Sequence, residues 1–285
     1  MLSLIAAIAD SALVVLLGTG MPRPNPEASG PATAVVVGQR VFLFDAGSGV
    51  ERQLAAAHLT IKGPTATFIT HLHSDHTLGL PDLLLTSWVM GRQKPLPLYG
   101  PPGLANMVHH IMLAWSEDID IRTKGLEQEF PGGERADVHE IKAGVVYDSG
   151  GVKITAIPVA HGSWPVAFGY RIDAPNRVIV ISGDTRPVPA LAAAARGADV
   201  LIHEVYPSAD ATAEARPGGD AWPTYLKAFH TSDTELGAMA QKAGVKLLIL
   251  YHIVRKKTTD AELLEGIRHG GFTGRVVIGH DLDRY

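Results

Sequence analysis

The 285-residue sequence contains no cysteine. This absence excludes disulfide bonds and every zinc site built on thiolates. The sequence also has no excess of positive charge, since 25 Lys and Arg against 29 Asp and Glu give a net charge of -4. Proteins that bind nucleic acid by charge alone are normally basic, so the composition argues against that class.

Long apolar runs are confined to the first 20 residues. Ala7-Ile8-Ala9 could be part of a signal-peptide cleavage site, but the positive segment that should precede it is missing and Asp10 interrupts the run. We interpret the segment as an apolar lead into a first buried strand and expect a cytoplasmic protein, with a truncated export signal as the alternative. No later segment has the length of a membrane span.

Short β-type runs recur along the rest of the chain. They are Leu13–Leu17, Ala34–Val37, Val41–Phe44, Ala66–Thr70, Val152–Val159, Ala167–Ile172, Val178–Ser182, Val200–His203, Lys246–Tyr251 and Arg275–Ile278. Many are continuously apolar, which is typical of strands covered on both faces.

Helical patterns fall between these runs. Gly103–Trp115 is one, and Ser232–Ala243 is marked by a capping box of Ser232 with Glu235. A second box, Thr259 with Glu262, opens another helix. Strands and helices without a long linker predict one α/β domain over residues 1–285, with two sheets inside and helices outside.

The strongest chemical signal is the run Thr70-His71-Leu72-His73-Ser74-Asp75-His76, directly after an apolar strand. In an extended segment His71 and His73 point the same way, because side chains alternate. Where the loop turns, Asp75 and His76 can point at a second ion. Imidazole and carboxylate ligands suit Zn²⁺. Four such donors in six residues favour a metal site over a solvated polar turn.

Three further donors stand where an apolar run meets a loop. They are His161, Asp184 and His252. Active-site residues of α/β folds usually lie at such strand ends. Each could by itself be a capping or buried hydrogen-bonding residue. Their shared placement predicts that they complete the metal site.

The His-x-His-x-Asp-His run and the three later donors, in that order, resemble the metallo-β-lactamase superfamily from about Leu16 to His280. The resemblance implies a four-layer αβ/βα sandwich with two zinc ions at one edge between the sheets. Manganese or iron could share such ligands. The resemblance also implies that one ion is bound by His71, His73 and His161 and that the other is bound by Asp75, His76 and His252. Asp184 would bridge both ions together with a water or hydroxide. Metal binding lowers the pKa of such a water to about 7.

Other motifs resemble the ribonuclease Z and arylsulfatase-like branch. They are Leu17-Gly18-Thr19-Gly20, Phe44-Asp45-Ala46-Gly47-Ser48-Gly49, Leu201-Ile202-His203-Glu204 and Phe229-His230-Thr231-Ser232. The resemblance implies that Glu204 orients His230, and that His230 donates a proton or stabilises a developing oxyanion. His230 also precedes a predicted helix start, which attracts anions. We expect Asp75, Glu204 and His230 to be catalytic.

Three weaker signals surround these motifs. Asp45 is expected to accept a hydrogen bond from a metal-binding histidine. The aromatic residues of Pro217–Phe229 could form a wall of the substrate pocket or pack as core, and Trp164 has the same two interpretations. The basic run Arg255-Lys256-Lys257 could touch a phosphate backbone, although a solvated turn is favoured.

The choice of substrate depends on what lies between His161 and Asp184. Only residues 162–183 separate them, which leaves no room for the tRNA-gripping arm of the usual bacterial ribonuclease Z. The main hypothesis is therefore a zinc-dependent hydrolase that uses a metal-bridging hydroxide on a small-molecule ester, such as a sulfate ester or phosphodiester. No membrane partner is expected, and a homodimer is left open.

Three alternatives remain. The first is a ribonuclease Z-like endonuclease that matures tRNA 3′ ends, with nucleic acid as partner. The second is a hydrolase that opens β-lactams or lactones. The third, a metal-binding scaffold without catalysis, is disfavoured because every expected ligand and both auxiliary residues are present.

Overall fold

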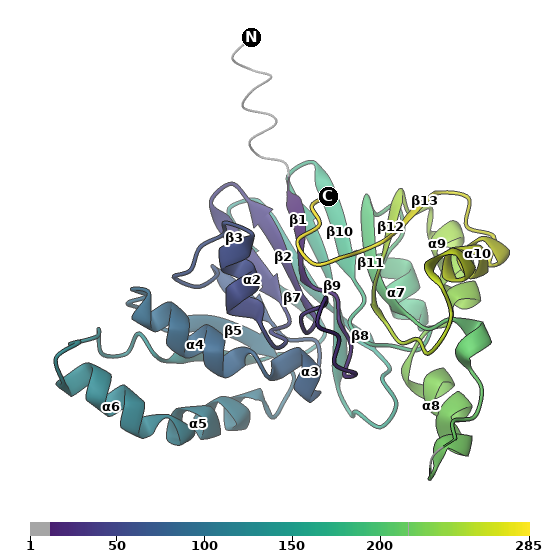
Figure 1. The fold of residues 1–285 in the computed structure, drawn as a ribbon. Helices are drawn as coiled ribbons and strands as arrows, with labels where there is room; N and C mark the ends of the chain where they lie inside the picture. The colour runs from purple at the N-terminus through teal and green to yellow at the C-terminus, as the bar shows by residue number, and fades with distance from the viewer. Residues whose placement is uncertain (1–11, 216) are drawn as a thin grey trace. The chain divides into compact units, whose positions relative to one another are not determined.

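A computed structural model describes residues 12–215 and 217–285 of the chain. It divides into two compact units (Figure 1). The first unit comprises the chain up to Lys142 together with His280–Tyr285, and the second unit is Ala143–Gly279. The apolar segment before residue 12 lies outside the described residues, and the single domain over residues 1–285 stays a prediction.

The first unit is built on a six-stranded sheet in sequential order. β1 and β2 pair antiparallel, as do β2 and β3, whereas β3 to β6 are parallel. The strands are β1 (Leu13–Gly18), β2 (Ala32–Val37), β3 (Arg40–Phe44), β4 (Ala66–Phe68), β5 (Leu96–Gly100) and β6 (Ala136–Glu140). The helices are α2 (Val50–Ala56), α3 (Ser74–Thr77), α4 (Leu80–Val89), α5 (Leu104–Ala114) and α6 (Ser116–Lys124).

The core of the first unit follows the alternation of its strands. Val15 and Leu17 of β1 and Leu43 of β3 belong to one buried cluster with Leu54 of α2 and Leu83 of α4. Every second strand residue faces these helices, as the period of two requires. Burial of such side chains is the main stabilising term of the unit.

The second unit is built on a seven-stranded sheet in the order β13-β12-β11-β10-β9-β8-β7. β7 to β10 are antiparallel and β10 to β13 are parallel. The strands are β7 (Gly144–Ser149), β8 (Val152–Val159), β9 (Ala167–Ala174), β10 (Arg177–Ile181), β11 (Val200–Val205), β12 (Leu247–Ile253) and β13 (Arg275–Ile278). The helices are α7 (Pro189–Ala194), α8 (Trp222–Phe229), α9 (Asp233–Ala243) and α10 (Asp260–His269).

The structure confirms the α/β class and all ten predicted strands, with ends that differ by at most two residues. Both predicted capping boxes are present, at the starts of α9 and α10. The sequence prediction missed β5, β6 and β7. Pro97 lies within β5, and Pro95 and Pro101 flank it, whereas β6 and β7 are largely exposed, so none of the three matches the apolar runs that predicted the other strands. Among the described residues, no helix is long and apolar enough to cross a membrane.

A buried carboxyl group in the first unit links its stability to pH. Glu51, in the first turn of α2, is 5% exposed, and its Oε1 atom has no hydrogen-bond partner among the described residues. Burial, together with the nearby charge of Asp82, raises the pKa of Glu51 from 4.5 to about 8, and the charge of Arg92 opposes this shift. The folded chain therefore favours the neutral acid.

The direction of the resulting pH dependence follows from this raised pKa. Between pH 4.5 and about 8 the unfolded chain binds fewer protons than the folded chain at Glu51. The contribution to stability is therefore full below pH 4.5 and is lost as the pH rises through about 8. We expect Glu51→Gln, which mimics the neutral acid, to raise the free energy of unfolding by about 1–3 kcal/mol at pH 8 and by little at pH 5. Urea unfolding at both pH values measures this, with the exposed Glu117→Gln as the control. An equal effect of Glu51→Gln at the two pH values would contradict the assignment.

Candidate functional site

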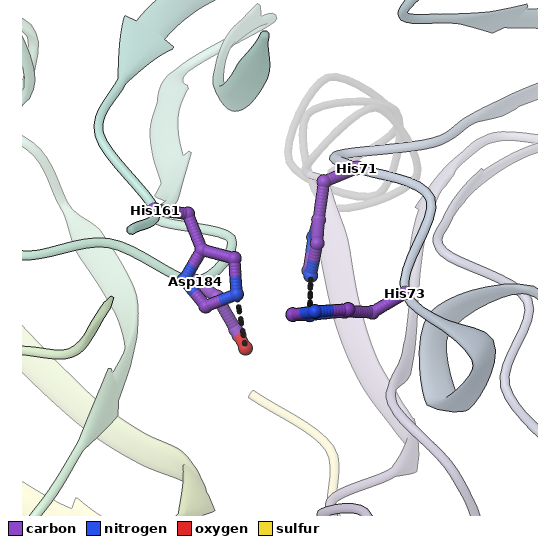
Figure 2. Close-up of side chains that lie close together, drawn as sticks. All are labelled: His71, His73, His161 and Asp184. Atoms are coloured by element: carbon purple, nitrogen blue, oxygen red, sulfur yellow. Dashed lines mark hydrogen bonds and ion pairs between the residues drawn. The ribbon is translucent and has the colours of Figure 1, made fainter. Parts of the chain in front are cut away.

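The first unit presents four donors from one short segment. The segment follows β4 and enters α3, so that His71 and His73 precede the helix and Asp75 and His76 lie in its only turn. The Nε2 atom of His71 is 2.9 Å from the Nδ1 atom of His73 (Figure 2). The two imidazoles therefore lie side by side, as the alternation of an extended segment predicts. His76 is fully buried, and its Nε2 atom is 3.6 Å from the Asp75 carboxylate.

Asp45 orients this segment. Its carboxylate accepts hydrogen bonds from the Thr70 amide at 2.8 Å, the Thr70 hydroxyl at 2.9 Å and His76 Nδ1 at 2.8 Å. Because the Thr70 hydroxyl donates to Asp45, its oxygen is left to accept from His71 Nδ1, 3.0 Å away. In both histidines Nδ1 is therefore the nitrogen that carries the proton, and Nε2 carries the lone pair that a metal ion needs, the arrangement typical of metal-binding histidines.

Glycines allow the chain to pack closely against the donor segment. A Cβ atom on Gly47 would lie 2.6 Å from the Asp75 carbonyl oxygen, and one on Gly30 would lie 3.0 Å from it. A Cβ atom on Gly79, just after α3, would lie 2.2 Å from the Gly47 carbonyl oxygen. Gly47, in the motif Phe44–Gly49, therefore has to be a glycine because other backbone segments approach it closely.

The second unit presents three donors from three different strand ends. His161 follows β8, Asp184 follows β10, and His252 lies within β12, one residue beyond the predicted strand end. The Asp184 Oδ2 atom is 3.8 Å from His161 Nε2 and 3.5 Å from His252 Nε2 (Figure 2 shows the His161 pair). All three side chains are buried. One carboxylate oxygen thus faces two imidazoles.

A bulge explains how a residue inside a strand becomes a donor. The pairing of β11 with β12 shifts register there, since Glu204 pairs with Tyr251 and Val205 pairs with Ile253. His252 is the extra residue, and its φ of 43° is in the left-handed region. Bulges re-aim side chains in this way near functional sites.

Glu204 and His230 are also in contact, as the resemblance implies. The Glu204 Oε2 atom is 3.2 Å from His230 Nδ1, and Oε1 accepts from the amides of Thr185 at 3.2 Å and Thr231 at 3.0 Å. Burial raises the pKa of Glu204 well above its ordinary value, and the nearby charge of Asp184 adds to this. The two threonines that anchor Glu204 were not predicted; their places beside Asp184 and His230 were the signal available in the sequence.

The predicted attraction of an anion to the helix start near His230 has no support in the structure. Ser232 and Glu235 cap α9 themselves, and the first turn already carries the carboxylates of Asp233 and Glu235. Donor atoms of Asp184, His230 and His252 lie within 4.8 Å of one another, so His230 has the geometry of either a proton donor or a ligand.

The donor sets fit transition-metal ions such as zinc. They contain imidazole and carboxylate groups, and in three of the histidines a protein acceptor takes the Nδ1 proton: Thr70 for His71, Asp45 for His76, and the Phe229 carbonyl at 2.8 Å for His161. Nitrogen-rich sites without sulfur suit zinc, and iron and manganese can share them.

Comparison with known proteins gives a consistent result. The model of the beta-lactamase superfamily domain matches residues 40–253. Ribonuclease Z of Mycobacterium bovis is 36% identical over 275 residues, which cover 95% of this chain and 96% of that protein. Ribonuclease Z of Mycobacterium marinum is 35% identical over 275 residues, covering 95% and 97% of the two chains.

Solved structures show the same fold. The metallo-beta-lactamase fold protein YhfI from Bacillus subtilis matches with a TM-score of 0.71 at 19% identity, covering 96% of this chain and 98% of that one. Human tRNase Z, short form, matches with a TM-score of 0.73 at 22% identity and the same coverages. The predicted metallo-β-lactamase fold is confirmed.

The contacts of Asp45 lead to a test of the donor segment. We expect Asp45→Ala to free the Nδ1 atom of His76 and the Thr70 hydroxyl, and to weaken metal binding about 10–100-fold, the usual cost of losing such a contact. Competition with a chromogenic chelator measures the affinity. Asp137→Ala is the control, because it removes an exposed carboxylate that pairs with His139 in the same unit. Unchanged affinity in a folded Asp45→Ala variant would show that Asp45 does not support a metal site.

Proposed function

Because the chain belongs to the metallo-β-lactamase superfamily and is a metal-dependent hydrolase, we propose that it is a binuclear endonuclease of the ribonuclease Z type that cleaves precursor tRNA at the 3′ end. The observation that carries this proposal is the 36% identity to an enzyme named ribonuclease Z over 95% of the chain. An alignment over 95% of the chain extends through both units.

The proposal replaces the small-molecule ester hydrolase as the leading hypothesis. That hypothesis depended on the missing arm between His161 and Asp184, where the structure contains only β9 and β10 and their connections. The alignment, however, covers 96% of the Mycobacterium bovis ribonuclease Z and 95% of this chain, so the two proteins have nearly the same length. The absence of a long arm therefore does not separate this chain from relatives of that name.

The same proposal includes two zinc ions. The donor set for one ion is His71, His73 and His161, the set for the other is Asp75, His76 and His252, and Asp184 is shared. The Nδ1 contacts of His71, His76 and His161 support this assignment, because an Nδ1–H that donates to a protein acceptor puts the lone pair that a metal ion needs on Nε2. Such a pair of ions supplies an acidified water and offsets the charge of the phosphodiester.

The protein's own residues supply the remaining chemistry. Asp184 places a negative charge beside the imidazoles of His161 and His252. Glu204, held by two backbone amides, orients His230 through Nδ1, and Nε2 is the nitrogen that we assign to the proton transfer. As a water oxygen bonds to phosphorus and the bond between phosphorus and the tRNA 3′ oxygen breaks, His230 donates a proton to that leaving oxygen.

A substrate panel tests the proposal. We expect the purified protein to cleave a precursor tRNA with a 3′ trailer, to lose this activity on chelation, and to regain it when zinc is added. The panel also contains a bis-aryl phosphodiester, an aryl sulfate and a chromogenic β-lactam. Cleavage of the aryl sulfate without the tRNA would restore the small-ester hypothesis, and β-lactam opening alone would favour that alternative. No turnover with zinc fully bound would favour a scaffold.

Two variants test the assigned roles. We expect His230→Ala to keep both metals and to lower kcat about 10²–10⁴-fold, the usual loss for a general acid. We expect Asp75→Ala to lose the second metal and nearly all turnover. Metal analysis of both variants, alongside single-turnover kinetics, distinguishes the roles. Loss of metal in His230→Ala would make His230 a ligand and contradict its assignment as proton donor.

A further inference from the structure

Three aromatic side chains of α8 form a continuous stack in the second unit. The rings of Trp222 and Tyr225 are 5.1 Å apart with an interplanar angle of 17°, and those of Tyr225 and Phe229 are 4.4 Å apart with an angle of 23°. Their spacing along the chain places them on one face of the helix. The three rings stack face to face and are half-buried.

Lys256 closes the outer end of this stack. Its ammonium group lies 5.4 Å from the centre of the Trp222 ring, donates to the Thr212 carbonyl at 2.6 Å and is 3.6 Å from Glu214. A cation over an indole ring is stabilising. The middle residue of the basic run therefore has internal partners, whereas a phosphate contact would need it free.

The inner end of the stack meets His161. The Phe229 ring contacts the His161 ring edge-on, with centres 5.0 Å apart and an angle of 84°. The carbonyl of Phe229 is 2.8 Å from His161 Nδ1, and the carbonyl of Ala228 accepts from the Gly162 amide at 3.0 Å. The last carbonyls of a helix have no partner within it. In α8 two of them bind the segment that carries His161.

Gly162 shows how tight this contact is. Its φ of 51° is left-handed, and a Cβ atom there would lie 2.0–2.2 Å from three carbon atoms of the Phe229 ring. Any larger residue would have to displace the ring or the segment. The ring and the segment thus determine each other's position.

We propose that Phe229 is a positioning residue for the metal site. Its carbonyl accepts the Nδ1 proton of His161 and so selects the tautomer whose Nε2 atom faces Asp184, and its ring, backed by the stack from Lys256 inward, keeps that carbonyl in place. The inference rests on the proposed function in one respect, namely that His161 binds a metal ion.

Phe229→Ala tests the inference in the metal-free and the zinc-loaded protein. Two-bond ¹H–¹⁵N spectra of histidine-labelled protein report the tautomer of His161. We expect a single Nδ1-protonated form in the parent protein and a mixture in Phe229→Ala. In Phe229→Ala we also expect the affinity for the zinc ion that His161 binds to fall about 10–100-fold, measured by competition with a chelator.

Two further variants test the same inference if the Phe229→Ala protein does not fold. Trp222→Leu removes only the outer ring, so a smaller change in the same direction is expected. Gly162→Ala displaces the ring from the other side and should match Phe229→Ala. The matched control is Phe272→Ala, which removes an equally apolar ring from the core of the same unit. It should lower stability without changing the His161 spectrum or zinc affinity.

His161→Ala separates failure of this inference from failure of the proposed function. If His161→Ala keeps both zinc ions, the metal assignment is wrong. If it loses one ion while Phe229→Ala and Gly162→Ala keep the parent tautomer and affinity, Phe229 has no positioning role.

Discussion

The commitment of one imidazole nitrogen to a fixed acceptor is the interaction on which the rest of this site depends. An imidazole that is free to rotate or to change tautomer presents either nitrogen, and a metal site needs one of them at a fixed position. Thr70 supplies the acceptor for His71, Asp45 for His76, and the Phe229 carbonyl for His161. The acceptors are chemically different, so they have no common sequence pattern.

In each unit the local backbone conformation positions the metal-binding side chains and the acceptors that orient them. In the first unit, Asp45 follows β3 with a left-handed φ of 59°, and its carboxylate holds the start of the donor segment. In the second unit, a bulge in β12 turns His252 out of the ladder, and the C-terminal turn of α8 meets the segment after β8. Strained or irregular backbone thus occurs where donors are held, and the regular strands provide the rigid support.

Particular residues show which parts of the fold and of the site could be predicted from the sequence. The donors were predictable because His-x-His-x-Asp-His directly follows an apolar run, and because His161 and Asp184 follow others. The contact of Glu204 with His230 was expected only through the family resemblance. The aromatic residues of α8 were left with two interpretations, since a stack and a pocket wall have the same sequence. Among the missed strands, β5 was masked by its prolines although Leu96 and Leu98 are buried, and β6 and β7 are largely exposed, so their neighbours in the sheet determine their conformation.

The sequence by itself determined the chemical class of the site, because ligand types and their places after buried strands are local properties. It also determined where α9 and α10 start, because each capping box uses two residues three positions apart. Only the tertiary structure decided which nitrogen of each histidine is committed, which residue of β12 is bulged, and where the rings of α8 pack. These depend on groups far apart in the chain, such as His161 and Phe229, whose approach is set by the packing of the whole unit and by no local preference.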